Sequence, residues 1–374
     1  MMRRIATPLF LFFVPALFGQ TSFYYPFSRP VILESAWPDL PDPAANTHTS
    51  SLPLYRHAEV RMRDFAEKAD GYWLFEPVSP VPDTADLVVF LHGYGGYNPV
   101  LYGAWIKHLV SQGYVVVYPR YQKNLVAPRP VQFSRNAAKA VKNAIARVHN
   151  EGRTCLRTDR MLYIGHSYGG VTAANMGVEW QALGIPQPRA MLLCQPGSGP
   201  IHNAVKKSYE GLPADLLLIA IVGNKDVVVG DTFSRLVLNT AVHTPMRSLV
   251  EHYSEPYRQR LLTSSHAEPY AIDPDLDTGL RNYTVNRGAI NTRTNVVDLY
   301  CYWKHADALL KILKTGSGTD LVFSDTPERR YLGRWFDGKP VRPLRVEAPE
   351  VSKSMAQKQP EIRGADAGGL NKKP

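Results

Sequence analysis

A serine between glycines is the first residue of this sequence whose surroundings suggest chemistry. Ser167 stands in the sequence GHSYGG, residues 165–170. A predicted strand, 160–164, comes directly before it, and a predicted helix, 171–182, comes after it. A serine on such a strand-to-helix turn takes a strained backbone conformation, which requires neighbours without side-chain bulk and raises the hydroxyl at a helix N-terminus. We therefore expect Ser167 to be a nucleophile.

A second glycine-rich sequence, HGYGG at residues 92–96, directly follows a predicted strand at 86–91. Attack of a serine on an acyl carbon creates a negatively charged oxygen, which two hydrogen-bond donors must stabilise. The backbone N–H of Tyr168, the residue after the nucleophile, is one expected donor. The backbone N–H of Tyr94 is the other. We expect His92 to brace this loop by hydrogen bonds and not to transfer protons.

A serine hydroxyl is a weak nucleophile, so it needs a base and an acid that orients the base. Asp226 follows the predicted strand 216–222 in the sequence NKD, which places it at the carboxyl edge of the sheet beside Ser167. Two other aspartates compete for this role. Asp215 precedes that strand, and Asp231 fits better as the cap of the next helix. Asp226 is therefore the expected acid.

Four histidines that follow Asp226 in the chain are candidates for the base. His252 lies inside a predicted strand, and His243 precedes that strand, at the wrong edge of the sheet. His305 lies in the middle of a predicted helix, where a packed or surface histidine is ordinary. His266 lies beyond the predicted strands in the loop LLTSSHAEPY, where a mobile base is needed. His266 is the expected base, and His305 is the second candidate.

The elements that must position these residues alternate regularly along the chain. Short apolar stretches alternate with amphipathic stretches of helix length, which is typical of a mainly parallel, doubly wound sheet with helices on both faces. The sequence thus predicts an α/β fold in a single domain, 56–345, with a long stretch at 255–294 and a folded C-terminal extension from about 315. The predicted strands are 59–65, 72–76, 86–91, 114–119, 160–164, 189–194, 216–222 and 247–253. The strand at 247–253 is expected to be the last one in the chain. The predicted helices are 100–112, 133–149, 171–182, 231–241 and 295–313.

The composition excludes several classes of function. The formal net charge is +10, but the Lys and Arg residues are scattered and are not interleaved with aromatics, so we expect no nucleic-acid partner. The three cysteines are an odd number, so at least one thiol is free. Cys194 and Cys301 stand in apolar patterns and are expected in the core. The cysteine spacing fits no metal site, and we predict none.

The two ends of the chain differ from the middle. Residues 1–19 have two arginines followed by the apolar run 5–18, which is the pattern of a signal peptide cleaved after Gly19. This predicts a secreted or periplasmic protein that is not stably inserted in a membrane after cleavage; retention of the run as a membrane anchor is the alternative. Residues 20–55 are expected to form an extended leader and residues 346–374 a disordered tail.

Taken in order, HGYGG, GHSYGG, NKD and SSH on these elements resemble the α/β-hydrolase fold over residues 59–314. The length and the secretion signal resemble the branch that holds chlorophyllase-like, cutinase-like and polyester-hydrolysing enzymes. Cutinases and polyester hydrolases are usually shorter and have paired cysteines, whereas this chain has an odd number. The resemblance implies a triad of Ser167, His266 and Asp226 and hydrolysis of carboxylic esters without a cofactor.

The expected function is therefore that of a serine esterase, lipase-like, that cleaves a small-molecule or polymeric ester through an acyl-enzyme on Ser167. The stretch 195–213 is short and polar, which favours an open cleft with Tyr94, Tyr97 and Tyr168 as aromatic walls. An amidase or acyltransferase with the same triad is one alternative. A non-catalytic binding protein on a hydrolase scaffold is another, although such proteins usually lose a triad residue. An adhesion module for wall or polymer surfaces is a third.

Overall fold

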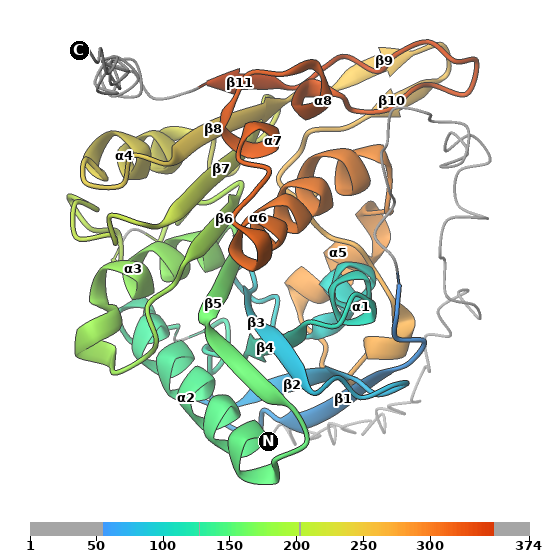
Figure 1. Ribbon diagram of the computed structural model, residues 1–374. Coiled ribbons are helices and arrows are strands. Elements are labelled where there is room, and N and C mark those ends of the chain that lie inside the picture. The colour runs from blue at the N-terminus through green and yellow to red at the C-terminus, as the bar shows by residue number, and fades with distance from the viewer. Residues whose placement is uncertain (1–54, 127, 202, 348–374) are drawn as a thin grey trace, which may run out of the picture.

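The computed structural model describes residues 55–126, 128–201 and 203–347, which form one large sheet flanked by helices (Figure 1). The strands of this sheet are β1 (Val60–Phe65), β2 (Tyr72–Pro77), β3 (Thr84–Leu91), β4 (Val115–Pro119), β5 (Cys155–His166), β6 (Ala190–Cys194), β7 (Leu217–Gly223), β8 (Arg247–His252) and β11 (Arg345–Glu347). The main helices are α1 (Gly103–Ser111), α2 (Phe133–Glu151), α3 (Tyr168–Leu183), α4 (Thr232–Thr240), α5 (Tyr283–Asn291) and α6 (Lys304–Thr315).

The order of the strands is β1-β2-β4-β3-β5-β6-β7-β8-β11. From β4 across to β8 all neighbours are parallel, whereas β1, β2 and β11 pair antiparallel at the two edges. The architecture is thus α/β with a mainly parallel sheet, as the sequence predicts. The carboxyl ends of the parallel strands meet at one edge, where loops from separate parts of the chain come together.

Each face of the sheet has its own hydrophobic core, because successive side chains of a strand point to opposite faces. In β3, Val88 and Phe90 pack with α1 and α6, whereas Leu87, Val89 and Leu91 pack with α2, α3 and α4. Figure 1 shows α2, α3 and α4 on the left of the sheet and α1 and α6 on the right. A strand that is buried on both faces is apolar throughout, which is why this one is recognisable in the sequence.

The spacing of apolar residues in the long helix α2 and the glycine that follows it together determine where this helix lies and where it ends. Its buried positions recur at helical spacing, and it ends at Gly152, which takes the left-handed conformation with φ of 63°. Its first residue, Phe133, packs its ring edge-on against Tyr168 at 5.3 Å. The helix therefore supports the turn that carries Ser167. The buried side chains of α2 are Phe133, Ser134, Ala137, Ala138, Ala140, Val141, Ala144 and Val148.

The C-terminal third holds more regular structure than the sequence predicts. A short hairpin, β9 (Glu255–Tyr257) with β10 (Arg260–Leu262), and α5 occupy the stretch 255–294, for which no element was expected. The extension adds α7 (Asp320–Phe323), α8 (Pro327–Arg330) and β11, which pairs antiparallel with β8. The prediction that 247–253 is the last strand is therefore wrong. Strands of three residues are too short to show an alternation of apolar and polar residues, so the sequence does not reveal them.

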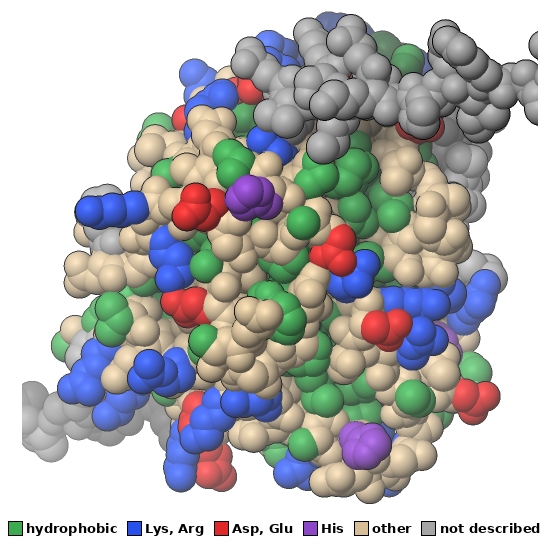
Figure 2. Space-filling view, turned by 60° about the vertical axis from the view of Figure 1, so that its left-hand side comes forward, with side chains coloured by type: hydrophobic (Ala, Val, Ile, Leu, Met, Phe, Trp, Pro, Cys, Tyr) green, Lys and Arg blue, Asp and Glu red, His purple; other side chains and the backbone are tan. Residues whose placement is uncertain are grey.

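Several predictions fall on the ends of the chain. The signal peptide, the leader up to residue 54 and the tail from residue 348 lie outside the described residues, whereas residues 346 and 347, which the sequence assigns to the tail, belong to β11. Within the described ranges no helix combines the length and the apolar character needed to cross a membrane. Figure 2 shows one face of the molecule, with Lys and Arg scattered among acidic and apolar side chains. All three cysteines are free, and Cys194 and Cys301 are buried, as predicted.

Candidate active site

The turn between β5 and α3 holds Ser167 in a strained conformation. Its φ of 55° and ψ of −123° are rare for a residue with a side chain. Three backbone hydrogen bonds hold it there: its N–H donates to Cys194 at 3.1 Å, and its carbonyl accepts from Gly170 at 2.9 Å and from Gly197 at 3.1 Å. Surroundings that hold a residue in a strained backbone conformation are typical of functional sites. The structure thus places Ser167 on the strand-to-helix turn that the sequence predicts.

Two glycines of this turn stand where a side chain would not fit, Gly169 against β3 and Gly165 against the turn itself. A Cβ atom at Gly169 would lie 2.0 Å from the carbonyl oxygen of Leu91, and one at Gly165 would lie 2.6 Å from the carbonyl oxygen of Gly169. Both distances are far below van der Waals contact with backbone atoms that cannot swing away. The glycines of GHSYGG are therefore required by the packing of the turn itself.

The structure brings Ser167, His266 and Asp226 into one chain of hydrogen bonds. The Oγ of Ser167 lies 2.8 Å from Nε2 of His266, and Nδ1 of His266 lies 2.7 Å from Oδ2 of Asp226. The other carboxylate oxygen of Asp226 accepts from the backbone N–H groups of Val228, at 2.9 Å, and Val229, at 3.1 Å. Because an ionised carboxylate only accepts, Nδ1 carries the proton and Nε2 is free to accept from the serine hydroxyl.

Solvent reaches the three groups unequally. The carboxylate of Asp226 is fully shielded, whereas the His266 side chain is 17% exposed. Ser167 is 8% exposed. The carboxylate of Asp226 therefore contacts protein alone, whereas solvent reaches Ser167 and His266 in part.

The other candidate histidines lie elsewhere. His252 is buried and lies 2.9 Å from the Tyr302 hydroxyl, and burial lowers its pKa to about 3. His305 is buried in α6, with Nδ1 2.6 Å from the Cys301 carbonyl. His243 is exposed in the turn before β8, at the opposite edge of the sheet. His266 is the candidate that the structure places beside the serine.

The competing aspartates also have other partners. Asp215 precedes β7 and pairs with Gln187 at 2.5 Å and with Arg189 at 3.3 Å. Asp231 takes the predicted N-cap position of α4, but its side chain makes no capping hydrogen bond, and its carboxylate accepts from Arg235 at 2.5 Å. Neither contacts the base.

The HGYGG loop lies directly against the nucleophile. A Cβ atom at Gly93 would lie 3.2 Å from Cβ of Ser167. Gly95 has a φ of 78°, and its N–H donates to Oε1 of Gln122 at 2.7 Å. Among the described residues, the backbone N–H groups of Tyr94 and Tyr168 have no hydrogen-bond acceptor. Both N–H groups therefore remain available to a ligand oxygen.

The buried ring of His92 braces this loop. Its Nδ1 lies 2.6 Å from the Gly93 carbonyl and its Nε2 lies 2.9 Å from the Arg120 carbonyl. The ring stacks on Tyr121 with centroids 4.2 Å apart. Burial lowers the pKa of His92 to about 4, so the ring is neutral at neutral pH and donates to one carbonyl at a time.

The three tyrosines expected as cleft walls differ in exposure. Tyr94 is partly exposed, and its hydroxyl donates to the Leu125 carbonyl at 2.6 Å. Tyr97 and Tyr168 are 8% and 1% exposed, and the guanidinium of Arg120 covers the Tyr97 ring at 5.3 Å. Of the three rings, that of Tyr94 is the most exposed, and the almost complete burial of Tyr168 does not fit its expected place as a cleft wall.

Two sets of residues near the site have no counterpart in the sequence predictions. The ring of His166 bridges the Tyr102 hydroxyl, at 2.7 Å, and the His266 carbonyl, at 2.9 Å. From α5 and its cap, Thr284 donates to the Tyr94 carbonyl at 3.0 Å and Asn282 donates to the Gly95 carbonyl at 2.8 Å. No local pattern announces these contacts, because they join segments about 60 to 190 residues apart.

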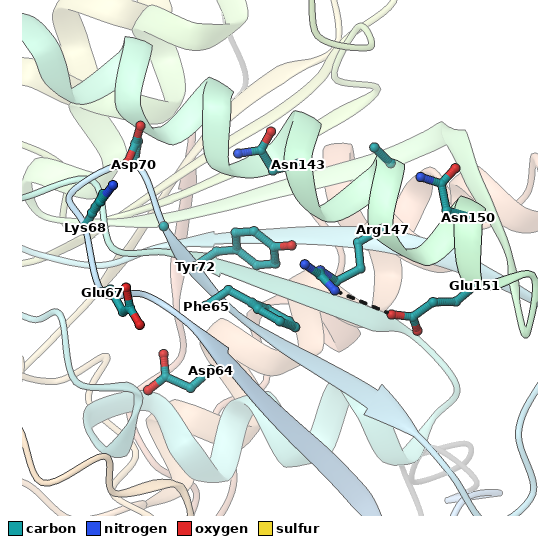
Figure 3. Close-up of a pocket in the computed structure, with 12 residues that line it drawn as sticks. Asp64, Phe65, Glu67, Lys68, Asp70, Tyr72, Asn143, Arg147, Asn150 and Glu151 are labelled. Atoms are coloured by element: carbon teal, nitrogen blue, oxygen red, sulfur yellow. Dashed lines mark ion pairs between the residues drawn. The ribbon is translucent and has the colours of Figure 1, made fainter.

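A separate groove of about 760 Å³ lies between the turn after β1 and the exposed face of α2 (Figure 3). Its aromatic residues are Phe65 and Tyr72, and the guanidinium of Arg147 covers the Phe65 ring at 4.1 Å. Figure 3 shows Arg147 pointing towards Glu151, its ion-pair partner. None of the residues that line this groove belongs to the chain of hydrogen bonds at Ser167.

In the part of the chain that the structure describes, no group of three or more His, Cys, Asp or Glu side chains is arranged to hold a metal ion. The geometry is that of a hydrogen-bonded chain of Ser167, His266 and Asp226 beside the HGYGG loop. A scan against models of protein families finds no match to this chain, and neither does a search of curated proteins.

Proposed function

We propose that this protein is a serine hydrolase of the α/β-hydrolase fold that cleaves carboxylic esters. The observation that carries the proposal is the hydrogen-bonded chain from Ser167 through His266 to Asp226, with steps of 2.8 Å and 2.7 Å. Two further features support it. The nucleophile stands on a strained turn between a parallel strand and a helix, and the three residues occur in the order Ser, Asp, His, which is the order in this fold.

Acylation is the first half of the proposed reaction. The Oγ of Ser167 forms a bond to the ester carbonyl carbon while Nε2 of His266 takes the hydroxyl proton. The carboxylate of Asp226 stabilises the imidazolium that results. The backbone N–H groups of Tyr94 and Tyr168 donate to the oxyanion. When the intermediate collapses, the ester C–O bond breaks, and His266 returns the proton to the departing alcohol.

Deacylation uses the same groups with water as the nucleophile. His266 takes a proton from water as the water oxygen attacks the acyl carbon. The second intermediate releases the carboxylic acid and restores the Ser167 hydroxyl with the proton from His266. Each proton therefore moves between His266 and an oxygen within hydrogen-bond reach of it, and the side chain of Asp226 stays ionised throughout.

Export is part of the proposal, and it is supported by the sequence of residues 1–19. Cleavage after Gly19 would leave a mature chain that begins at Gln20. Sequencing the N-terminus of protein recovered outside the cytoplasm tests this: a chain that begins at Met1 would contradict it.

The test of the function is hydrolysis of p-nitrophenyl esters, from acetate to decanoate, by the wild type and three variants. We expect Ser167→Ala and His266→Ala to lower kcat/KM by roughly a thousandfold or more. His243→Ala is the matched control, since this histidine is exposed at the opposite edge of the sheet, and it should leave hydrolysis unchanged. A folded Ser167→Ala protein that still hydrolyses these esters would overturn the proposal. A parallel series of p-nitroanilides separates esterase from amidase activity.

A further inference from the structure

The most exposed large apolar side chains of the described residues gather around the candidate active site. Those with the highest exposed fractions are Val227 (94%), Val126 (93%), Ile290 (78%), Val131 (71%) and Tyr283 (69%). We call these five residues the apolar rim. Single exposed apolar side chains are ordinary on a protein surface, but a concentration of the most exposed ones around one site indicates an interaction surface.

Each segment of the apolar rim adjoins, in the chain, a residue that contacts the site. Val227 follows Asp226, the hydrogen-bond partner of His266. Val126 follows Leu125, whose carbonyl accepts from the Tyr94 hydroxyl at 2.6 Å. Val131 stands two residues before Phe133, which packs against Tyr168. The rim therefore approaches the nucleophile through the acid loop and the loop before α2.

Helix α5 supplies the third side. Tyr283 and Ile290 are exposed on this helix, while Val285 is buried beneath it. Thr284, between them in the chain, donates to the Tyr94 carbonyl at 3.0 Å. The helix is thus anchored on the HGYGG loop and presents its apolar side chains to solvent beside it.

The charges of the same segments are of one sign. Residues 121–126, 128–132, 224–229 and 282–291 contain the exposed cations Lys123, Arg129, Lys225 and Arg287. Their one acidic residue is Asp226, whose carboxylate is buried. Segments that combine exposed apolar side chains with cations and carry no exposed anion of their own are complementary to an apolar layer with anionic groups at its boundary.

We propose that the apolar rim and its cations form a docking surface for an anionic lipid layer, from which an ester group reaches Ser167. The apolar side chains enter the boundary between headgroups and acyl chains, and the four cations contact the anionic headgroups. The delivery of an ester from the lipid layer to Ser167 rests on the proposed function. Binding of the protein to the lipid layer does not require hydrolysis. It assigns the substrate class as esters held in an anionic lipid surface.

The test is cosedimentation of the full chain carrying Ser167→Ala with vesicles, so that binding is measured without turnover. One set of vesicles contains equal parts of phosphatidylcholine and phosphatidylglycerol, and the other contains phosphatidylcholine alone. We expect the added changes Val126→Ser, Val227→Ser and Ile290→Ser together to weaken binding to the mixed vesicles by about tenfold or more. The matched control changes Val81→Ser, Val242→Ser and Leu321→Ser, which are exposed valines and a leucine outside the rim segments, and should leave binding unchanged.

The cations are tested separately. Neutralising Lys123, Lys225 and Arg287 to Gln should weaken binding to the mixed vesicles by roughly fivefold for each cation removed, and should not change binding to phosphatidylcholine alone. An environment-sensitive fluorophore reports the orientation. Both labelled proteins carry Cys155→Ser, so that the new cysteine is the exposed thiol among the described residues. The emission of a fluorophore attached through Val126→Cys should shift to the blue when mixed vesicles are added. The emission of one attached through Val242→Cys should not shift, because Val242 lies before β8 at the opposite edge of the sheet.

Two results with vesicles would overturn the proposal: absence of binding to the mixed vesicles, or an equal loss of vesicle binding in the rim and control variants. Binding to a polyester film in place of vesicles would also overturn it, because a polymer would then be the partner of this surface. Because Ser167→Ala carries the binding assay, docking without ester hydrolysis in the wild type would contradict the proposed function alone. Ester hydrolysis without docking would contradict this inference alone.

Discussion

The Nε2 atom of His166 lies 2.9 Å from the carbonyl oxygen of His266, so the residue before Ser167 is hydrogen-bonded to the loop that carries His266. A carbonyl only accepts, so Nε2 carries the ring proton and Nδ1 accepts from the Tyr102 hydroxyl at 2.7 Å. The Tyr102 oxygen in turn accepts from the Gly93 N–H at 3.0 Å. Burial lowers the pKa of His166 well below its ordinary value and keeps the ring neutral. One chain of hydrogen bonds thus joins the HGYGG loop, the nucleophile turn and the base.

Tyr102→Phe tests this chain because it removes the hydroxyl and keeps the ring. We expect kcat for ester hydrolysis to fall about tenfold while KM changes little, since positioning is lost and ground-state binding is kept. Tyr209→Phe is the control: it removes another buried hydroxyl, which donates to Asn175 at 3.1 Å away from the triad. Both variants should lose about 1–2 kcal/mol of unfolding free energy. Equal kcat values in the two variants would show that Tyr102 is structural alone.

Gly93→Ala tests how closely the HGYGG loop must approach the nucleophile. The new methyl group would lie 3.2 Å from Cβ of Ser167 and 3.3 Å from Nδ1 of His166, so the loop must shift by a few tenths of an ångström. We expect kcat/KM to fall by about tenfold to a hundredfold, because the proposed oxyanion donor of this loop, the Tyr94 N–H, moves with it. Affinity for a phenylboronic acid, which mimics the tetrahedral intermediate, should fall in parallel. Unchanged boronate affinity would contradict an oxyanion role for this loop.

Glu268 makes the stability of the protein depend on pH between about 4.5 and 7. Burial raises the pKa of this carboxyl to about 7, although Asn295 donates to it at 2.5 Å and Thr263 also bonds to it. Because the pKa in the folded state is above the ordinary 4.5, its contribution is fully present below 4.5 and is lost as pH rises through 7. Relative to Glu268→Gln, the wild type should lose about 1.4 kcal/mol of unfolding free energy per pH unit in this interval. Urea unfolding across the interval measures this, and parallel curves for the two proteins would contradict it.

His252 has the opposite effect from Glu268: its contribution to the unfolding free energy is lost as the pH falls. Burial lowers its pKa from 6.5 to about 3, so its contribution is present above 6.5 and is lost as pH falls towards 3. We expect His252→Gln to reduce the acid loss of unfolding free energy by about 1.4 kcal/mol per pH unit below 6.5. His243→Gln, at an exposed position, should behave as the wild type. An acid loss of equal slope in all three proteins would exclude this histidine as its source.

The elements that hold Ser167 could be predicted from local sequence because local physics sets them. The residues 87–91 of β3 are apolar on both faces, and a Cβ atom at Gly169 or Gly165 would lie 2.0 Å or 2.6 Å from a carbonyl oxygen. The position of His266 could be predicted from chain order, since the loop after β8 leaves the edge of the sheet where β7 ends. Ser167, Asp226 and His266 therefore lie together as the patterns indicated.

The remaining parts of the site could not be predicted, for a physical reason. Helix α5 has the sequence YTVNRGAIN, with few strong helix formers and a glycine at its centre, so propensity does not reveal it. Its place is set by Asn282 and Thr284, which bond to a loop nearly two hundred residues earlier in the chain. The partners of His166 are equally remote. Such contacts depend on tertiary packing and leave no periodic pattern.

The central claim, that His266 and Asp226 activate Ser167, is tested most directly by covalent labelling with diisopropyl fluorophosphate, followed by mass spectrometry. We expect a single adduct on Ser167 in the wild type, with loss of ester hydrolysis in proportion to labelling. His266→Ala and Asp226→Asn should slow the labelling by roughly a hundredfold or more, because the hydroxyl loses its oriented base. No adduct on Ser167, or labelling at the wild-type rate in His266→Ala, would contradict the account.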